Sequence, residues 1–330
     1  MTAKTYLVTG GAGFIGAALV RRLLEDGYGV RVLARCPLDQ AARLTSLGAD
    51  LEYVEADVRD ADAVAKAAKG VDGILHFAAI TATDKFYDTP DQVLDVGVKG
   101  MLSVLDACME HDIGELVLAS SSEAYQTPDK VPTDETEPLT VPDPMNPRYS
   151  YASSKIISEL MAINFGRNHI GRVLVCRPHN VYGPDMGWSH VLPHFILRMK
   201  RLAGETPDGP IPFPIMGTGR ETRAFEYIDD FVDGTMIMMD KGEHLGIYHI
   251  GTDEETAIAD AAKLIGDFYG RTVEVKPSPA PEGGTPRRCP DISKLVALGY
   301  RPRFGLADGL PIMARWYDEN ADAAPNIDTP

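Results

Sequence analysis

The feature of this 330-residue chain that most limits its fold is a regular alternation of strand-like and helix-like segments, from residue 4 to about residue 178. Short β-branched and apolar runs are each followed by longer stretches whose apolar residues have helical spacing. Such alternation is typical of a parallel sheet, because each helix returns the chain across a face of the sheet. We therefore expect a doubly wound, Rossmann-type α/β domain.

The alternation ends after residue 178. Stretches rich in proline and glycine then separate short strand-like and helical segments. This pattern predicts a smaller, mixed α/β C-terminal lobe over residues 179–330, with a disordered tail from about residue 320. Within the first half, residues 38–48 are expected to form a helix.

The composition excludes several classes of partner. The net charge is -16, which would repel nucleic acid and anionic membrane surfaces. No apolar run approaches the roughly 20 residues of a membrane helix, and the first residues lack the pattern of a secretory signal. The four cysteines are far apart and lack metal-ligand spacing, so we expect reduced thiols, no metal site and a cytoplasmic protein.

A glycine-rich turn lies between the first strand and the first helix. The sequence "TGGAGFIG" places Gly10, Gly13 and Gly16 three residues apart, with Phe14 and Ile15 between the last two. Glycines at this point permit a tight turn and let the backbone approach a pyrophosphate at the helix N-terminus. These five residues are therefore predicted to bind a dinucleotide.

The end of the second strand indicates which dinucleotide is bound. An acidic residue there binds the 2'-hydroxyl of NAD, whereas an arginine suits the 2'-phosphate of NADP. Here Ala34 occupies the position of the acid, and Arg35 follows. The sequence therefore favours NADP over NAD, with a merely solvated Arg35 as the alternative.

The ends of the third and fourth strands supply further cofactor contacts. Asp57 is placed to contact the adenine, with Val58 beside it. Ala78 and Ala79 are expected to line the phosphates and the nicotinamide ribose. His76, in the same segment, is interpreted as a packed strand-end residue.

The sequence "YASSK" places Tyr151 and Lys155 four residues apart, on one face of a predicted helix. A tyrosine hydroxyl has a pKa near 10 and is a poor base at neutral pH. A neighbouring ammonium group should lower that pKa and make Tyr151 a usable proton acceptor. Ser121, at the end of a preceding strand, is the third candidate catalytic residue.

Together, "TGGAGFIG", "SSSEAY" and "YASSK" resemble the extended short-chain dehydrogenases/reductases, specifically the nucleotide-sugar epimerases, dehydratases and decarboxylases. The resemblance implies a transient oxidation of a nucleotide-diphosphate sugar. Tyr151 would take the proton of the sugar C4 hydroxyl while hydride passes to the nicotinamide. Ser121 would bind the same oxygen, and Lys155 would hold the ribose.

The resemblance also implies substrate-binding residues. "RPHNVYGP" places Asn180 on the sugar diphosphate, "GTGRETRAFEYIDD" places Arg223 on the diphosphate, and "RRCPDISK" places Arg288 near the phosphate or sugar. The alternative for both arginines is a surface ion pair with Asp229 or Asp291.

In that family the nucleotide domain would comprise residues 1–178 with a returning segment at about 226–250, and a homodimer through a helix pair is usual. The chain departs from the family pattern at Gly97, where an asparagine is common, and at Glu221, where a glutamine is common. Gly97 bears on the proton relay, not on the fold.

The segment Ser121–Ser122–Glu123 bears on the reaction. Dehydratases of the family typically read T-D-E here, decarboxylases T-S-E with an arginine at the position of Arg288, and many 4-epimerases lack the glutamate. The leading interpretation is a 4-epimerase. The alternatives are a decarboxylase or 4,6-dehydratase that uses Glu123, a sugar-nucleotide 4-dehydrogenase or reductase, and a non-enzymatic dinucleotide sensor.

Glu123 and Ser122 are included among the candidate catalytic residues. In an extended segment, residues i and i+2 share a side, so Glu123 would face the sugar near C5 and C6 together with Ser121. This placement predicts an acid/base role for Glu123 if the reaction extends beyond C4.

Overall fold

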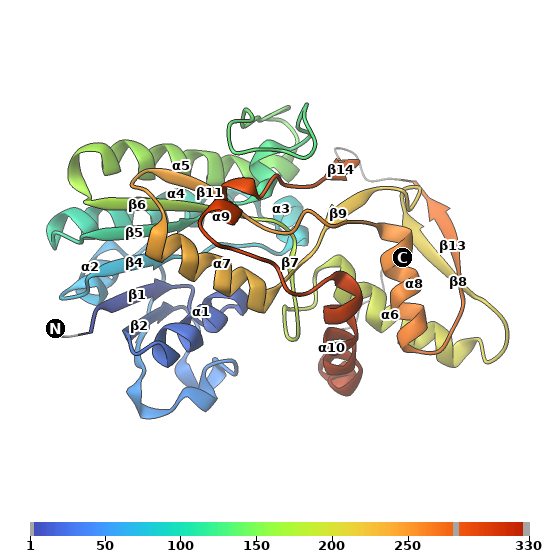
Figure 1. Cartoon of the computed structure of the whole chain (residues 1–330). Coiled ribbons are helices and arrows are strands. Elements are labelled where there is room, and N and C mark those ends of the chain that lie inside the picture. Colours follow the sequence, from blue (N-terminus) through green and yellow to red (C-terminus); the bar gives the residue numbers. More distant parts are fainter. Residues whose placement is uncertain (1–2, 280–283, 326–330) are drawn as a thin grey trace.

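The computed structural model describes residues 3–279 and 284–325, and its centre is a seven-stranded parallel sheet (Figure 1). The strand order is β11-β6-β5-β4-β1-β2-β3. The strands are β1 (Thr5–Thr9), β2 (Gly29–Ala34), β3 (Glu52–Glu55), β4 (Gly73–His76), β5 (Glu115–Ala119), β6 (Arg172–Pro178) and β11 (Gly246–Ile250). The prediction of a doubly wound parallel sheet is confirmed.

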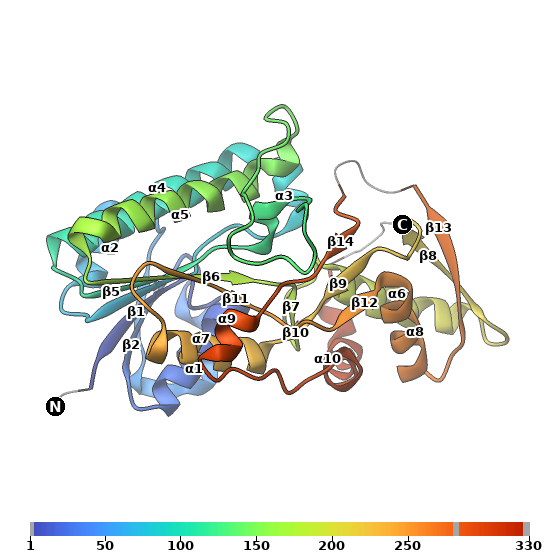
Figure 2. The ribbon, with the colours of Figure 1, turned by 45° about the horizontal axis from the view of Figure 1, so that its top comes forward.

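Helices cover both faces of this sheet. Helices α2 (Ala61–Ala68), α4 (Pro90–Glu110) and α5 (Ser150–His169) lie on one face, and α1 (Phe14–Glu25) and α7 (Ile228–Lys241) lie on the other (Figures 1 and 2). Successive side chains of a strand point to opposite faces, so Leu7 joins the core under α2 and α4 while Val8 joins the core under α1 and α7.

Helices α4 and α5 lie side by side (Figure 2) and approach closely at Gly97. A Cβ atom at Gly97 would lie 2.6 Å from the Cβ of Ser154, closer than non-bonded carbons can approach. An asparagine side chain therefore has no room here. Close packing of the two helices accounts for this departure from the family pattern.

The segment 38–48 is not the expected helix. It contains two short 3-10 turns, Leu38–Gln40 and Thr45–Asp50. Between them, Arg43 donates two hydrogen bonds to the carbonyl of Asp185, at 3.1 and 2.7 Å. This tertiary contact and the burial of Leu44 outweigh a weak local helix preference.

The C-terminal lobe has mixed α/β structure, as expected. Its helices are α6 (Val191–Glu205), α8 (Ile258–Phe268) and α10 (Leu306–Glu319), and strands β8 (Ile211–Met216) and β13 (Val273–Ser278) pair in parallel beside them. A three-stranded sheet of β12 (Glu255–Ala257), β9 (Thr222–Ala224) and β14 (Arg287–Arg288) faces the main domain. The expected disordered tail falls partly on 326–330, outside the described residues; Ala321–Ala323 form a 3-10 turn.

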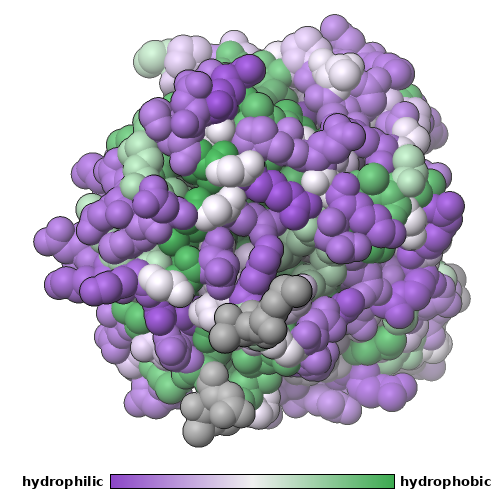
Figure 3. Space-filling model, turned by 60° about the vertical axis from the view of Figure 1, so that its left-hand side comes forward, coloured by the Kyte–Doolittle hydropathy of each residue, from purple (hydrophilic) through white to green (hydrophobic). Residues whose placement is uncertain are grey.

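The surface is largely hydrophilic on the face that Figure 3 draws. Figure 3 shows a face on which hydrophilic residues predominate and hydrophobic residues are interspersed among them. Within residues 3–279 and 284–325, no helix is long and apolar enough to cross a membrane.

Candidate active site

The glycine-rich turn joins β1 to α1 at the point where the strand order reverses, between β1 and β4. Gly10 has φ +72°, and a Cβ there would lie 2.8 Å from the backbone of Ala78. At Gly16 a Cβ would lie 2.3 Å from the Gly10 carbonyl oxygen, and Gly13 is the N-cap of α1. At Gly10 and Gly16 only glycine fits, and the shape of the turn suits a pyrophosphate at a helix N-terminus.

The ends of β2 and β3 form the region predicted to bind adenosine. Ala34 is buried, and Arg35 is exposed, with no hydrogen bond or ion pair to the rest of the described chain. Asp57 is not free: both of its carboxylate oxygens accept hydrogen bonds from Arg59, at 2.8 and 2.9 Å. Arg59 lowers the pKa of Asp57. Arg59 was missed by sequence reasoning, although it follows Asp57 by two residues.

Three further cofactor candidates lie beyond the ends of β3 and β4. Val58 is buried and packs against Gly100 of α4. A Cβ atom at position 100 would lie only 2.8 Å from a methyl carbon of Val58, so the glycine makes room for this valine. Ala78 and Ala79 are partly exposed beyond the end of β4. His76 is buried and pairs through Nδ1 with the Thr9 hydroxyl at 2.8 Å, as a packed strand-end residue would.

The structure brings the three candidate catalytic residues together. Tyr151 of α5 lies close enough to Ser121 for the serine hydroxyl to act on its pKa, and its ring stacks on Phe86 with centroids 4.9 Å apart. Lys155 lies one turn further along α5, with Nζ 5.7 Å from the centroid of the Tyr151 ring. Lys155 Nζ also donates to the Ala119 carbonyl at 2.7 Å. Phe86 was not identified from the sequence.

The expected lowering of the tyrosine pKa is not found. Burial raises the pKa of Tyr151 to about 12, opposed by the hydrogen bond with Ser121 and reinforced by the charge of Glu123. Burial also lowers the pKa of Lys155 to about 8. Desolvation outweighs the neighbouring ammonium here because both groups lie inside the protein and lose their hydration.

The segment after β5 is not extended, so the alternation of residues i and i+2 that was expected for Ser121 and Glu123 does not apply. Ser122–Tyr125 form a 3-10 turn, η3, and the Ser121 hydroxyl caps it by accepting from the Glu123 amide at 3.1 Å. Ser122 is buried. Glu123 nevertheless lies in the site, because its charge acts on Tyr151.

Glu123 is surrounded by three arginines. Its Oε1 atom accepts from Arg288 Nη1 at 2.6 Å, so Arg288 makes an ion pair with Glu123, and not with Asp291. Arg288 and Arg223 are register neighbours on β14 and β9. Burial alone would raise the pKa of Glu123, but Arg288, Arg148 and Arg223 hold it below its usual value.

Arg148 is a further residue that sequence reasoning missed. It lies three residues before Tyr151, and its Nε, like that of Arg288, is buried with no hydrogen-bond partner among the described residues. Burial, together with Arg288 and Arg148, lowers the pKa of Arg223 to about 10. Such a cluster of partly desolvated guanidinium groups suits a bound anion.

Asn180, the remaining substrate candidate, and Glu221, a departure from the family pattern, both contact the backbone near this cluster. Asn180 has φ +44°, and its amide donates to the Ala224 carbonyl at 3.1 Å, beside Arg223. Glu221 turns back to its own loop and accepts from the Thr218 amide at 3.0 Å.

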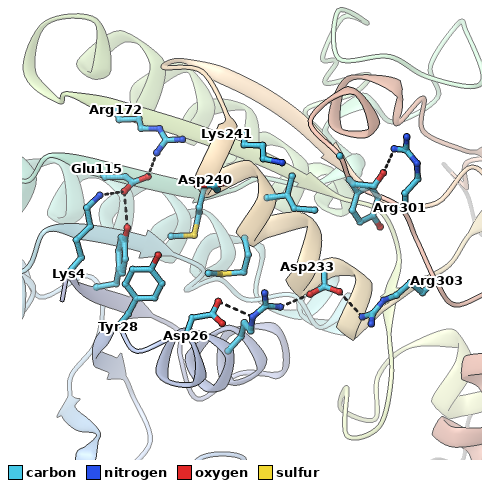
Figure 4. A pocket seen from close by; sticks show the side chains of 17 residues that line it. Lys4, Asp26, Tyr28, Glu115, Arg172, Asp233, Asp240, Lys241, Arg301 and Arg303 are labelled. Atoms are coloured by element: carbon cyan, nitrogen blue, oxygen red, sulfur yellow. Dashed lines mark hydrogen bonds and ion pairs between the residues drawn. The ribbon is translucent and has the colours of Figure 1, made fainter.

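A cavity of about 860 Å³ (Figure 4) lies beside the first residues of β1, β5 and β6, at the end of the strands opposite to Ser121. Its charged groups are mostly paired with one another: Glu115 with Lys4 and Arg172, and Arg22 with Asp26 and Asp233. These pairs connect β1, β5, β6, α1 and α7, so they lock elements together and leave little free charge for a ligand.

The model of the NAD dependent epimerase/dehydratase family matches residues 6–251. The chain belongs to this family. It is 31% identical over 323 residues to a dTDP-glucose 4,6-dehydratase of Streptomyces antibioticus, with 95% of this chain and 92% of the relative covered. It is also 31% identical over 323 residues to a putative UDP-glucose 4-epimerase of Methanocaldococcus jannaschii, with 95% and 98% covered.

Solved structures of family members have the same fold. The UDP-glucose 4-epimerase of Thermotoga maritima, with UDP-glucose, has a TM-score of 0.83 and 27% identity over 96% of this chain and 99% of that one. The dTDP-glucose 4,6-dehydratase DesIV of Streptomyces venezuelae, with NAD bound, has a TM-score of 0.83 and 31% identity over 97% and 98%. The predicted family and its enzymatic character are confirmed, and the family is NAD-dependent.

Proposed function

We propose that this family member is a nucleotide-diphosphate-sugar 4-epimerase that acts by transient oxidation at C4 of the sugar. The observation that carries the proposal is the placement of Tyr151 beside Ser121 and one helical turn from Lys155. The glycine-rich turn, Ala78 and Ala79 would hold the dinucleotide, which supplies the hydride acceptor when bound.

In this reaction Tyr151 takes the proton of the C4 hydroxyl as the C4–H bond gives up its hydride. Ser121 donates a hydrogen bond to the same oxygen and fixes it against the tyrosine. The positive charge of Lys155 favours the phenolate form of Tyr151, against the burial that raises the pKa of the tyrosine. After the keto-sugar has turned over, Tyr151 returns its proton to the oxygen, and the hydride returns to the opposite face of C4.

The charge state of Glu123 supports an epimerase. A 4,6-dehydratase needs a proton donor for the C6 hydroxyl that leaves, and a base for the C5 proton. Three arginines hold Glu123 as the carboxylate, a form that cannot donate a proton and is a weak base. Ser122 provides no carboxylic acid in its place.

A second candidate is a decarboxylase or 4,6-dehydratase. One observation favours it: Glu123 and its partner Arg288 lie close enough to Tyr151 for the glutamate to affect the tyrosine's pKa. The pair would then stand beside C5 and C6 of the bound sugar.

We assign the substrate diphosphate to Arg148 and Arg223, with Asn180 supporting the adjacent backbone. Arg288 is engaged by Glu123, which leaves two cations for a group that carries about two negative charges.

The cofactor assignment is NADP in preference to NAD, because Arg35 is exposed and unpaired beside the uncharged Ala34. NAD remains the cofactor named for the family.

We further assign a cytoplasmic homodimer formed through α4 and α5. The outer face of this helix pair exposes large apolar side chains: Leu94, Leu102, Met109, Ile157 and Leu160. Burial of such a face between two copies is favourable. Leu160 is the most exposed of these residues, at 58%. Sedimentation analysis of Leu160→Glu should show a monomer if this face forms the dimer.

The test of function is proton NMR of the purified protein with a panel of UDP-, dTDP- and GDP-hexoses and UDP-glucuronate. An epimerase converts a gluco- into a galacto-configured product of equal mass. Loss of water would identify a dehydratase, and loss of carbon dioxide a decarboxylase. Either result would replace the 4-epimerase assignment with the second candidate.

A further inference from the structure

Two side chains of α5 hold consecutive residues at the end of β5. Lys155 Nζ donates to the Ala119 carbonyl at 2.7 Å, and the Ser120 hydroxyl donates to a carboxylate oxygen of Glu159. Lys155 and Glu159 are four residues apart, so they lie on one face of the helix. The next residue along the chain is Ser121. Helix α5 therefore fixes the two residues that precede the catalytic serine.

Glu159 is itself fixed by Arg177 of β6. Arg177 Nε donates to Glu159 Oε1 at 2.9 Å, and Nη2 donates to Oε2 at 2.6 Å. Each side chain is only 3% exposed, so water screens this pair little. A bidentate pair of this kind sets the orientation of the carboxylate as well as its position.

The same guanidinium group reaches the far end of η3. Arg177 Nη1 donates to the hydroxyl of Tyr125, the last residue of this turn. The Glu159–Arg177 pair is thus bonded to Ser120 before the catalytic segment and to Tyr125 after it. Ser121 and Glu123 lie between these two anchor points.

We propose that Glu159 is a positioning residue of the active site, which with Arg177 fixes the turn that carries Ser121 and also maintains the charge of Lys155. The inference rests on the proposed function, because it concerns the placement of groups for chemistry at C4. Glu159 has no part in the reaction itself: it acts through Ser120, Arg177 and Lys155.

The electrostatic part of the role concerns Lys155. Burial lowers the pKa of Lys155 to about 8, while the nearby Cys176 and Glu159 oppose this shift. The other titratable groups that face Lys155 are His76 on β4 and Tyr151 on α5. Without the negative charge of Glu159, Lys155 should lose its proton at a lower pH.

Three variants separate this role from general stability. Glu159→Gln removes the charge, and Ser120→Ala removes one hydrogen bond while the Glu159–Arg177 pair stays intact. Glu115→Gln is the matched control. Glu115 is also a buried carboxylate that pairs with one arginine, Arg172 at 3.1 Å, and accepts from a hydroxyl, that of Tyr6 at 3.0 Å. It is the first residue of β5 and so lies at the end of the strand opposite to Ser120.

The first measurement is amide hydrogen exchange of residues 119–126 in the full chain with bound dinucleotide. Exchange there should be roughly tenfold faster in Glu159→Gln and several-fold faster in Ser120→Ala, and unchanged in Glu115→Gln. This readout needs no turnover. If the wild type converts no nucleotide sugar, the proposed function fails, while the exchange result still decides the positioning role.

The second measurement is the pH profile of turnover for whichever sugar the wild type converts. The alkaline limb should move to lower pH by about one pH unit in Glu159→Gln and stay in place in Ser120→Ala and Glu115→Gln. Equal exchange of residues 119–126 in all variants would overturn the positioning role. A uniform loss of rate at every pH would overturn the electrostatic role. If Glu159→Gln does not fold, hydrogen exchange of Ser120→Ala decides the positioning role. Glu159→Asp, which keeps the negative charge, then decides the electrostatic role and should retain the wild-type alkaline limb.

Discussion

Glu123 and Arg288 form an ion pair, with 2.6 Å between Oε1 and Nη1, although 165 residues separate them in the chain. The glutamate belongs to the turn after β5, and the arginine belongs to strand β14 of the C-terminal lobe. The pair therefore joins the two halves of the molecule near Tyr151.

The first prediction concerns the reaction of a Glu123→Gln variant. For a 4-epimerase we expect turnover within about tenfold of the wild type, because Tyr151 does the acid/base chemistry. Reactions run in deuterium oxide should place no deuterium at C5 or C6, as judged by NMR. Deuterium at either carbon in the wild-type product, absent from the variant product, would contradict the epimerase assignment.

The ion pair also predicts a pH dependence of stability. The pKa of Glu123 is lower in the folded than in the unfolded chain, so its contribution is present above the unfolded value of about 4.3 and is lost as pH falls through the folded value. Between pH 6 and 3, the wild type should lose more unfolding free energy than Glu123→Gln. Urea titrations at several pH values measure this, and parallel losses would argue against it.

Tyr151→Phe should lower turnover by about 10²–10⁴-fold while dinucleotide binding changes little, because only the hydroxyl that accepts the proton is removed. The ring and its stacking on Phe86 remain. Steady-state kinetics and calorimetric titration with the dinucleotide check the two parts. Retention of more than about a tenth of the wild-type rate would refute the role of Tyr151.

Arg35→Ala should weaken NADP binding more than NAD binding, because it removes a cation that only the 2'-phosphate uses. Titration of the dinucleotide-free protein with both cofactors gives the two dissociation constants. Wild-type protein that binds NAD as tightly as NADP would show that Arg35 is only a solvated residue.

Gly97→Ala should destabilise the fold by about 1–3 kcal/mol, because the new methyl group meets Ser154 at 2.6 Å. Gly204→Ala is the matched control: Gly204 also lies in a helix, α6, but a Cβ there meets no atom within 4 Å. Chemical denaturation should show little change or a slight gain for the control. Equal effects at the two positions would contradict close packing of α4 on α5.

What could be predicted from the sequence was local in the chain. The glycine-rich turn and the Tyr151–Lys155 pair depend on residues within one strand–turn–helix or one helical face, so spacing alone reveals them. Arg148 and the Glu159–Arg177 pair depend on contacts between elements, and no local pattern marks them. The pKa of Tyr151 was misjudged for the same reason, because its burial is a property of the assembled site.

The order of the strands in the sheet has a consequence for synthesis of the chain. Strand β6 ends at Pro178, but its outer neighbour β11 begins only at Gly246, about 70 residues later. At about 5–20 residues per second, a ribosome needs roughly 3–14 seconds to supply that partner. During this interval the edge of β6 offers unpaired backbone groups to any other nascent strand. A fragment cut at residue 178 keeps that open edge permanently, so we expect it to aggregate although it contains the whole glycine-rich turn and Tyr151.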